Sequence, residues 1–342
     1  MNASAPDMDQ MLDEAARRLA AGGLVAFPTE TVYGLGADAE NPAAVARIYA
    51  AKGRPVGHPI IVHLAPEADL GYWASSVPPE ARALIQAFWP GPLTLILPRA
   101  PHIPDAVSGG QSSIGLRCPS HPVAQALLRR FAGLKPGGQG GVAAPSANKF
   151  GQVSPTHAAH VRSEFPELDP AELLVLEGGP SQVGIESTIV DVSRVADGVG
   201  PMLLRPGHVT AAQIAAVLGR EPARPDAGAP RASGTLKAHY APRTPLRVMP
   251  RQDIARISRE DRQGRIAVVA FEPLAGSAGP GVDWIAAAHE PEAYARELYA
   301  LLRRLDQQGY AGIVLERPPA LPAWQAVNDR IGRAAAAFSR EA

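Results

Sequence analysis

Short apolar runs, each ending near proline or glycine, restrict the fold of this chain more than any other feature. Residues 24–27, 91–100 and 202–207 contain three of these runs. Runs of this length between turn residues are typical of β-strands. Segments with apolar residues at helical spacing, such as residues 121–133, lie between them. The alternation predicts an α/β fold with a mixed, twisted sheet and helices. Further strands are expected within residues 58–65, 112–120, 140–148 and 187–193.

A break in this pattern separates two domains. Residues 219–245 are rich in Pro, Ala, Gly and Arg and follow neither the helical nor the strand period. A strand–helix–strand order returns after them, and a last helix is expected over residues 325–338. We predict an α/β domain over residues 1–218, a linker over residues 219–245, and a small Rossmann-like α/β domain over residues 246–342.

The composition narrows the class of protein. The 342 residues contain 33 Lys and Arg against 33 Asp and Glu, so we expect no bulk attraction to polyanions. A single cysteine, Cys118, excludes an intrachain disulfide and a cysteine-built metal cluster, and it fits a reducing compartment. The N-terminus lacks the basic start and apolar block of a signal peptide, and no apolar run reaches about 18 residues. We expect a cytoplasmic protein without a membrane span.

The common sequence signatures of nucleotide binding and hydrolysis are missing. The chain has no G-x-x-x-x-G-K-[ST] loop, no G-x-G-x-x-G opening a helix, no H-E-x-x-H and no G-x-S-x-G. Cations and small hydroxyl residues at predicted strand ends remain, without an evident nucleophile or general base. A site made of such residues would work mainly by positioning reactants and neutralising charge.

Three loop-like stretches combine small, hydroxyl and glycine residues. "FPTETVYGLGADA", residues 27–39, offers hydroxyls for hydrogen bonds and glycines where a backbone can bend or approach a ligand closely. The other interpretation, which the stretch alone favours, is a glycine-rich turn whose threonines bond their own backbone. "AAPSANKFGQVSPT" and "GGPSQVGIESTIVDV", residues 143–156 and 178–192, also allow two interpretations, a ligand-binding loop or a plain connector.

Four cations and a histidine are further candidates. Lys52 and Arg54 bracket a glycine, which suits a polyphosphate but also a solvated helix end. Arg117 ends an apolar run and needs an anionic partner, which is an internal Asp or Glu or a substrate carboxylate. Arg205 ends another strand, where either a ligand crevice or solvent could face it. His63 lies in an apolar strand, where a histidine is usually a core or rim residue.

Eight motifs stand in one order along the chain: "PTETVYGLG", "KGRP", "IIVH", "WPGPLTLIL", "GLRCP", "APSAN", "GPSQVGIESTIVD" and "LRPG". In this order and approximate spacing, over about residues 10–210, the chain resembles the YrdC-like family, the L-threonylcarbamoyladenylate synthases. The linker's "HYAP" and the small α/β tail resemble the longer, two-domain members.

The resemblance implies a nucleotidyltransferase that combines L-threonine, bicarbonate or CO2, and ATP into threonylcarbamoyl-AMP and releases pyrophosphate. Other proteins would then transfer the threonylcarbamoyl group to an adenosine of tRNA, giving threonylcarbamoyladenosine (t6A). Contact with tRNA itself is expected to be indirect or weak. The carbamate formed from threonine is its own nucleophile, so no catalytic serine or cysteine is needed. Mg2+ is expected to arrive with ATP, and no metal is expected on the protein itself.

The resemblance also implies the roles of individual residues. L-threonine would contact Thr31, His63, Arg117, Ala144 and Ser187, with Arg117 at its carboxylate. ATP would contact Lys52, Arg54, His58, Ser113, Ser146, Ser154, Arg205 and Tyr240. Lys52, Arg54 and Arg205 would neutralise phosphates, and Lys52, Arg54 and Arg117 form the predicted catalytic set. Tyr240, in "HYAP", would close over the nucleotide as part of a lid.

Some positions depart from the family's pattern, and two rival functions stay open. His58 stands where many members have asparagine, residues 133–141 look like an added loop, and the linker lacks the "PGM" turn often seen in the family. One rival is an RNA-binding module, because single-domain relatives have a concave, basic surface. The other is carbamoyl transfer, as in hydrogenase maturation proteins, which carry zinc-finger regions that one cysteine cannot build.

Overall fold

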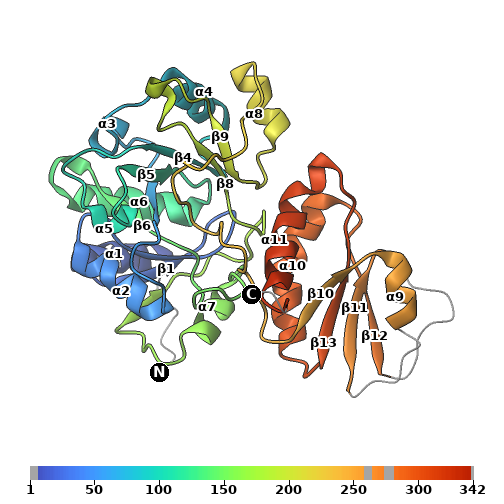
Figure 1. Ribbon diagram of the computed structural model, residues 1–342. Coiled ribbons are helices and arrows are strands. Elements are labelled where there is room, and N and C mark those ends of the chain that lie inside the picture. The colour runs from blue at the N-terminus through green and yellow to red at the C-terminus, as the bar shows by residue number, and fades with distance from the viewer. Residues whose placement is uncertain (1–6, 258–263, 273–280, 340–342) are drawn as a thin grey trace, which may run out of the picture. The chain divides into compact units, whose positions relative to one another are not determined.

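The chain forms two compact units. The computed structural model describes residues 7–257, 264–272 and 281–339 (Figure 1). The first unit runs to Phe150 and includes Pro155–Gln182 and Glu186–Thr235. The second contains Gly151–Ser154, Val183–Ile185 and the chain from Leu236 onwards. The segment predicted as a linker is therefore divided between the two units.

The first unit is built on a nine-stranded sheet with the order β7-β1-β2-β6-β3-β5-β4-β8-β9. The sheet is mixed, since β3 and β5 pair in parallel whereas β4 and β5 pair antiparallel. This confirms the predicted α/β class. The strands are β1 Leu24–Phe27, β2 Gly34–Asp38, β3 Ile61–Leu64, β4 Leu93–Pro98, β5 Ser113–Arg117, β6 Gly141–Ala143, β7 Leu173–Val175, β8 Thr188–Asp191 and β9 Met202–Arg205.

Helix α2 (Pro42–Lys52) of the first unit begins and ends at residues with the expected capping chemistry. The side chain of Asn41 accepts hydrogen bonds from the N–H groups of Ala43 and Ala44, and Gly53 ends the helix with a φ of 60°. The others are α1 Met8–Ala20, α3 Leu70–Trp73, α4 Pro79–Phe88, α5 Asp105–Ser108, α6 Pro122–Leu134, α7 Ala158–Glu164 and α8 Ala211–Leu218.

Side-chain alternation gives the central strands a core face and a second face. Val62 and Leu64 of β3 and Ile114 and Leu116 of β5 belong to the largest buried apolar cluster. Residues between them in sequence point to the opposite side of the sheet, because successive strand residues alternate. The second face is therefore the one that carries Ile61 and His63 of β3 and Gly115 and Arg117 of β5.

The strand β2 was not predicted. Its sequence, part of the stretch interpreted as a loop, contains two glycines, which usually weaken a strand. A Cβ atom at Gly36 would lie 2.8 Å from Val142 Cγ1 and 2.9 Å from Phe27 Cε1. Glycine at this position therefore lets the strands approach closely instead of making a turn.

The second unit has a four-stranded parallel sheet in the order β10-β13-β11-β12. The predicted strand–helix–strand core is confirmed by β11 (Ile266–Ala270), α10 (Pro291–Asp306) and β13 (Gly312–Glu316). Parallel strands need crossover connections, and α9 lies on one side of this sheet while α10 and α11 lie on the other (Figure 1). The remaining elements are β10 Leu246–Met249, α9 Arg251–Ile257, β12 Val282–Ala286 and α11 Gln325–Ala336.

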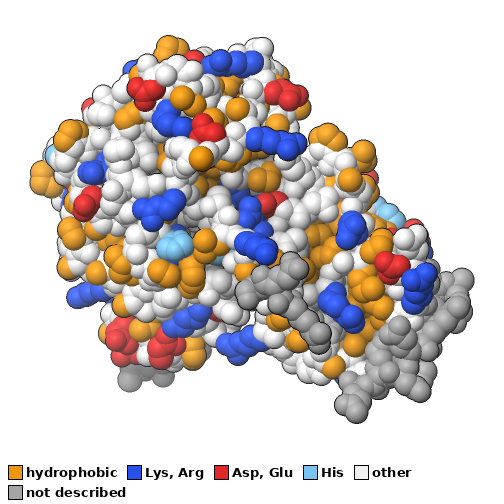
Figure 2. Space-filling view, viewed as in Figure 1, with side chains coloured by type: hydrophobic (Ala, Val, Ile, Leu, Met, Phe, Trp, Pro, Cys, Tyr) orange, Lys and Arg blue, Asp and Glu red, His pale blue; other side chains and the backbone are white. Residues whose placement is uncertain are grey.

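The described surface mixes charges of both signs. On the face in Figure 2, Lys and Arg side chains are interspersed with Asp, Glu and apolar side chains. This mixture agrees with the balanced count of 33 basic and 33 acidic residues. Within residues 7–257, 264–272 and 281–339, no helix is long and apolar enough to cross a bilayer.

Candidate functional site

The second face of the first unit's sheet brings two predicted threonine ligands together. Ile61 and His63 of β3 share this face, and so do Gly115 and Arg117 of β5, because residues two apart in a strand point the same way. In the parallel pair, Ile61 lies opposite Gly115 and His63 lies opposite Arg117. The sheet register therefore places the imidazole and the guanidinium on adjacent strands.

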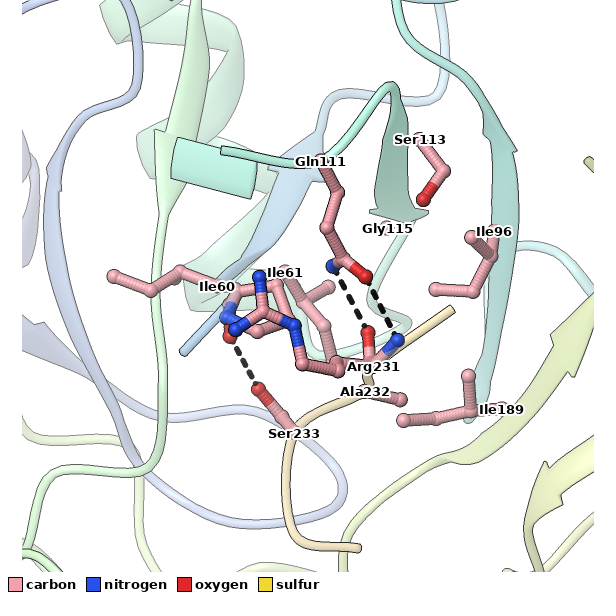
Figure 3. Close-up of a pocket in the computed structure, with 11 residues that line it drawn as sticks. Ile60, Ile61, Ile96, Gln111, Ser113, Gly115, Ile189, Arg231, Ala232 and Ser233 are labelled. Carbon is pink, nitrogen blue, oxygen red and sulfur yellow. Dashed lines mark hydrogen bonds between the residues drawn. The ribbon is translucent and has the colours of Figure 1, made fainter. Parts of the chain in front are cut away.

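An apolar floor continues across the neighbouring strands (Figure 3). Ile61, Ile96 and Ile189 belong to one buried cluster on this face. Gly115 lies between the isoleucines of β3 and β4, where an added Cβ would be 3.2 Å from Ile96 Cδ1. Ser113, predicted to contact ATP, lines the same pocket with its hydroxyl. Such a floor with a few polar groups is typical of a small-molecule site.

His63 and Arg117 each carry one buried nitrogen without a hydrogen-bond partner among the described residues. Within the described part of the chain, His63 Nδ1 and Arg117 Nε have no hydrogen-bond partner. Both residues are buried, at 3% and 4% exposure. Burial, together with the charge of Arg117, lowers the pKa of His63 from 6.5 to about 3, so the imidazole is neutral near pH 7. Buried polar atoms are normally paired, so these two indicate where ligand atoms can bind.

Arg117 also has an internal partner. Its Nη2 donates to Glu30 Oε1 at 2.6 Å, and both side chains are buried. Glu30 Oε2 accepts a hydrogen bond from the Ser120 N–H at 3.1 Å. Of the two partners considered for Arg117, the internal acid is therefore present, while its Nε remains for a substrate.

The other predicted threonine contacts lie on buried backbone around this face. Thr31 is fully buried, and its Oγ1 lies 2.9 Å from Thr29 Oγ1. Ala144 directly follows β6, and its N–H donates to Ile61 O at 3.0 Å. Ser187 precedes β8, and its Oγ lies 2.8 Å from Thr94 Oγ1 of β4. These three residues come from different connections, after β1, after β6 and before β8.

Lys52 is as buried as Arg205 and more buried than Arg54, the other two predicted phosphate cations. It is 2% exposed, and its ammonium donates to the carbonyl oxygens of Ser146, at 2.6 Å, and Asn148. Burial lowers the pKa of Lys52 well below its ordinary value, and the charge of Arg54 lowers it further. The contact joins two predicted nucleotide residues, Lys52 and Ser146.

Arg54 and Arg205 meet at one residue, Ser233. Arg54 Nη2 donates to Ser233 Oγ at 3.2 Å and to Pro59 O at 2.9 Å. Arg205 Nη1 donates to Ser233 O at 2.8 Å, and its Nε and Nη2 donate to Ser187 O. The two cations therefore flank one backbone segment and connect it to the threonine contact Ser187.

That segment, residues 231–233, lies against the apolar pocket. Gln111 Nε2 donates to Arg231 O at 3.1 Å, and the Arg231 N–H donates to Gln111 Oε1 at 2.8 Å (Figure 3). Ser233 Oγ donates to Pro59 O at 2.8 Å. A cavity of about 10 Å³ remains in the pocket, which is room for about one water molecule. Part of the predicted linker thus covers Ser113 and the isoleucine floor.

Three further predicted ATP contacts are divided between the units: His58 belongs to the first, and Ser154 and Tyr240 belong to the second. His58 is partly buried, its ring lies 5.4 Å from that of Phe150, and burial and the charge of Arg54 lower its pKa. Ser154 belongs to the second unit, where Arg303 Nε donates to its carbonyl oxygen at 3.3 Å. Tyr240 also belongs to the second unit.

Tyr240 has an unusual backbone conformation. Among the described residues it is the only non-glycine with a positive φ, at 63°. Its ring stacks on Tyr299 at 5.8 Å, and the Arg330 guanidinium lies 5.3 Å from the ring centroid. A large side chain in this region of φ is strained, which is common at functional positions.

Sequence reasoning missed three residues with direct contacts at this site. Thr94 left one signal, a hydroxyl residue within the apolar "GPLTLILP". Glu30 lies inside a recognised motif, but its place in the sequence does not indicate which residue it contacts. Ser233 left no signal, because the linker follows no hydrophobic period and its contacts depend on folding across the sheet.

Neither a reactive thiol nor a metal-binding cluster is found among the described residues. Cys118 is buried, and burial raises the pKa of its thiol to about 12, so it packs as a small apolar residue. Within the part of the chain that the structure describes, no three His, Cys, Asp or Glu side chains group to hold a metal ion.

Comparisons with known proteins agree with this architecture. Residues 17–207 match the Sua5/YciO/YrdC family model, described as "Telomere recombination", and residues 209–336 match the model described as "Threonylcarbamoyl-AMP synthase, C-terminal domain". The threonylcarbamoyl-AMP synthase of Bacillus subtilis is 38% identical over 341 residues, covering 96% of this chain and 93% of the relative. That of Pyrococcus abyssi is 36% identical over 315 residues, covering 88% and 87%.

The fold also matches a solved structure over nearly its whole length. The crystal structure of P. abyssi Sua5 complexed with L-threonine has a TM-score of 0.82 and 32% sequence identity, covering 98% of this chain and 96% of that one. The similarity spans both units.

Proposed function

Because this chain belongs to the Sua5/YciO/YrdC family, in its two-domain threonylcarbamoyl-AMP synthase form, we propose that the second face of its larger sheet is where the reaction takes place. The protein is a threonylcarbamoyl-AMP synthase, a nucleotidyltransferase whose product serves t6A modification of tRNA. The assignment of residues to its substrates is our proposal.

L-threonine is proposed to bind at His63 and Arg117. The observation that carries this assignment is the pair of buried, unsatisfied nitrogens, His63 Nδ1 and Arg117 Nε, on adjacent strands. The Arg117 Nε–H donates to the substrate carboxylate, which is the acceptor that a guanidinium fits best. Thr31, Ala144 and Ser187 close the pocket around the side chain and amine.

The chemistry is proposed to run through a carbamate. Bicarbonate gives CO2 and hydroxide. The uncharged threonine amine attacks the CO2 carbon to form a C–N bond, and the proton that it loses combines with the hydroxide to give water. A carbamate oxygen then attacks the α-phosphorus of ATP, and the bond to the β-phosphate oxygen breaks to release pyrophosphate. Both reacting groups come from substrates, so the protein has to position them and neutralise the phosphate charge.

Lys52, Arg54 and Arg205 supply that positive charge in our proposal, and the negative charge of bound ATP would raise the lowered pKa of Lys52. Their present hydrogen bonds are to carbonyl and hydroxyl oxygens, which a phosphate oxygen can replace as an acceptor. His58, Ser113, Ser146, Ser154 and Tyr240 remain the further proposed ATP contacts. Mg2+ is proposed to be held by the phosphates of ATP, where it would neutralise charge on the leaving pyrophosphate.

We also propose which proteins use the product and in which compartment the enzyme works. Proteins that transfer the threonylcarbamoyl group to tRNA would consume the product, with tRNA itself bound weakly or not at all. The single cysteine fits work in the cytoplasm. Bulk RNA binding is disfavoured because the 33 Lys and Arg are balanced by 33 Asp and Glu.

Pyrophosphate release tests the proposal directly. We expect release from ATP to require both L-threonine and bicarbonate and to be indifferent to added RNA. Arg117→Ala should raise the KM for L-threonine sharply and leave the KM for ATP nearly unchanged. Tight RNA binding without threonine-dependent pyrophosphate would exclude the mechanism, and equal losses for both substrates would exclude the role of Arg117.

A further inference from the structure

Glu30 is a buried acid at the threonine face that has no role in the mechanism so far. Its side chain is 4% exposed. One carboxylate oxygen accepts from Arg117 Nη2 at 2.6 Å, and the other accepts from the Ser120 N–H at 3.1 Å. Glu30 therefore connects the loop after β1 to the segment that leaves β5.

The contact with Glu30 restricts how Arg117 can present its donors. A guanidinium has five N–H groups in a rigid, planar fork. Glu30 binds at Nη2, while the neighbouring Nε is buried and, in the described part of the chain, has no acceptor. With Nη2 held, rotation of the fork is restricted, and the Nε–H stays on the face that also carries His63 Nδ1.

Charge gives Glu30 a second effect at the same place. Arg117 and Glu30 cancel, and His63 is neutral, so these three groups carry no net charge near pH 7. A neutral pocket suits an amino acid zwitterion, whose own charges also cancel. Without Glu30, the buried Arg117 would have an uncompensated charge and a flexible side chain free to turn toward other acceptors.

We propose that Glu30 is a positioning residue for L-threonine: it fixes the Arg117 guanidinium so that the Nε–H meets the substrate carboxylate. The inference rests on the proposed contact between Arg117 and that carboxylate. Glu30 itself touches Arg117 and Ser120, and Thr31 remains the direct contact from this loop.

Glu30→Gln is the first test. The amide has the same shape but only one acceptor oxygen, so either Arg117 or the Ser120 N–H then faces an NH2 group. In steady-state pyrophosphate release we expect the KM for L-threonine to rise about tenfold or more. The KM for ATP should change less than about twofold, since the phosphate cations are held elsewhere. A general loss of structure would not produce this split.

Glu67→Gln is the matched control. Glu67 also pairs with an arginine, Arg129, at 2.9 Å, but the two side chains are 64% and 48% exposed. Removing the charge of this surface acid should leave both KM values at the wild-type level. Glu30→Asp keeps the charge and shortens the reach by one methylene, so its KM for L-threonine should lie between those of wild type and Glu30→Gln.

Combining variants separates this inference from the function on which it rests. If Glu30 acts through Arg117, then Glu30→Gln should cause no further rise in the threonine KM when Arg117 is already Ala. An unchanged threonine KM in Glu30→Gln, alongside a raised one in Arg117→Ala, overturns the role of Glu30 alone. An unchanged threonine KM in Arg117→Ala overturns both. If melting curves show that Glu30→Gln does not fold, a wild-type threonine KM in Glu30→Asp overturns the inference.

Discussion

Replacing His63 by Asn should reduce the loss of folding stability that the protein shows as the pH falls below 6.5. The imidazole is buried on β3 next to Arg117, and together these lower its pKa from 6.5 to about 3. Asn keeps an amide near the position of Nδ1 but does not titrate. The difference in pH dependence between wild type and His63→Asn therefore reports the protonation of this one imidazole.

The sign and size of this pH effect on stability follow from the pKa of His63, which is 6.5 in the unfolded chain and about 3 in the folded chain. Between pH 3 and 6.5 the unfolded chain protonates this histidine and the folded chain does not, so unfolding takes up a proton. The contribution to stability is complete above the unfolded pKa and is lost as pH falls, by about 1.4 kcal/mol per pH unit. At pH 5.0 the loss is about 2 kcal/mol, and over the whole window it is about 5 kcal/mol.

Two measurements check the reasoning. Urea unfolding at pH 7.5 and 5.0 should show a drop in the free energy of unfolding that is about 2 kcal/mol larger for wild type than for His63→Asn. An NMR titration of labelled histidine in the wild-type protein should show the His63 ring neutral down to about pH 4. A ring that titrates near its ordinary pKa, or equal pH dependence in the two proteins, would refute the burial argument.

Two further predictions concern a hydrogen bond and an ion pair between residues that are distant in the sequence. Thr94→Val removes the bond to Ser187, so the threonine KM should rise about twofold to tenfold, as for loss of one neutral hydrogen bond; a wild-type KM would show that Thr94 does not orient Ser187. Lys135→Met, in the added loop of residues 133–141, leaves Asp38 without its 2.8 Å ion pair, and urea unfolding should show a loss of about 1.5–3 kcal/mol. No change in that free energy would mean that the loop is not anchored by this pair.

Several elements could be predicted because their signal lies within one segment. The strand over Leu24–Phe27 and the helix α2, with Asn41 at its start and Gly53 at its end, are found where the sequence places them. Among the strands that were not predicted, β7 and β12 lack such a signal. β7 (Leu173–Val175) has three residues, and β12 (Val282–Ala286) is only partly buried, so neither shows a clear period.

The sequence by itself determined the strand period, the order of the motifs and the family to which they belong. It placed His63 and Arg117 on strands and required an anionic partner for Arg117. It could not choose that partner, because Glu30 lies 87 residues away and meets Arg117 only through the order of strands in the sheet. The contact of Ser233 with Arg54 spans 179 residues for the same reason. Periodicity describes one segment at a time, whereas register and loop closure across the sheet decide which distant side chains meet.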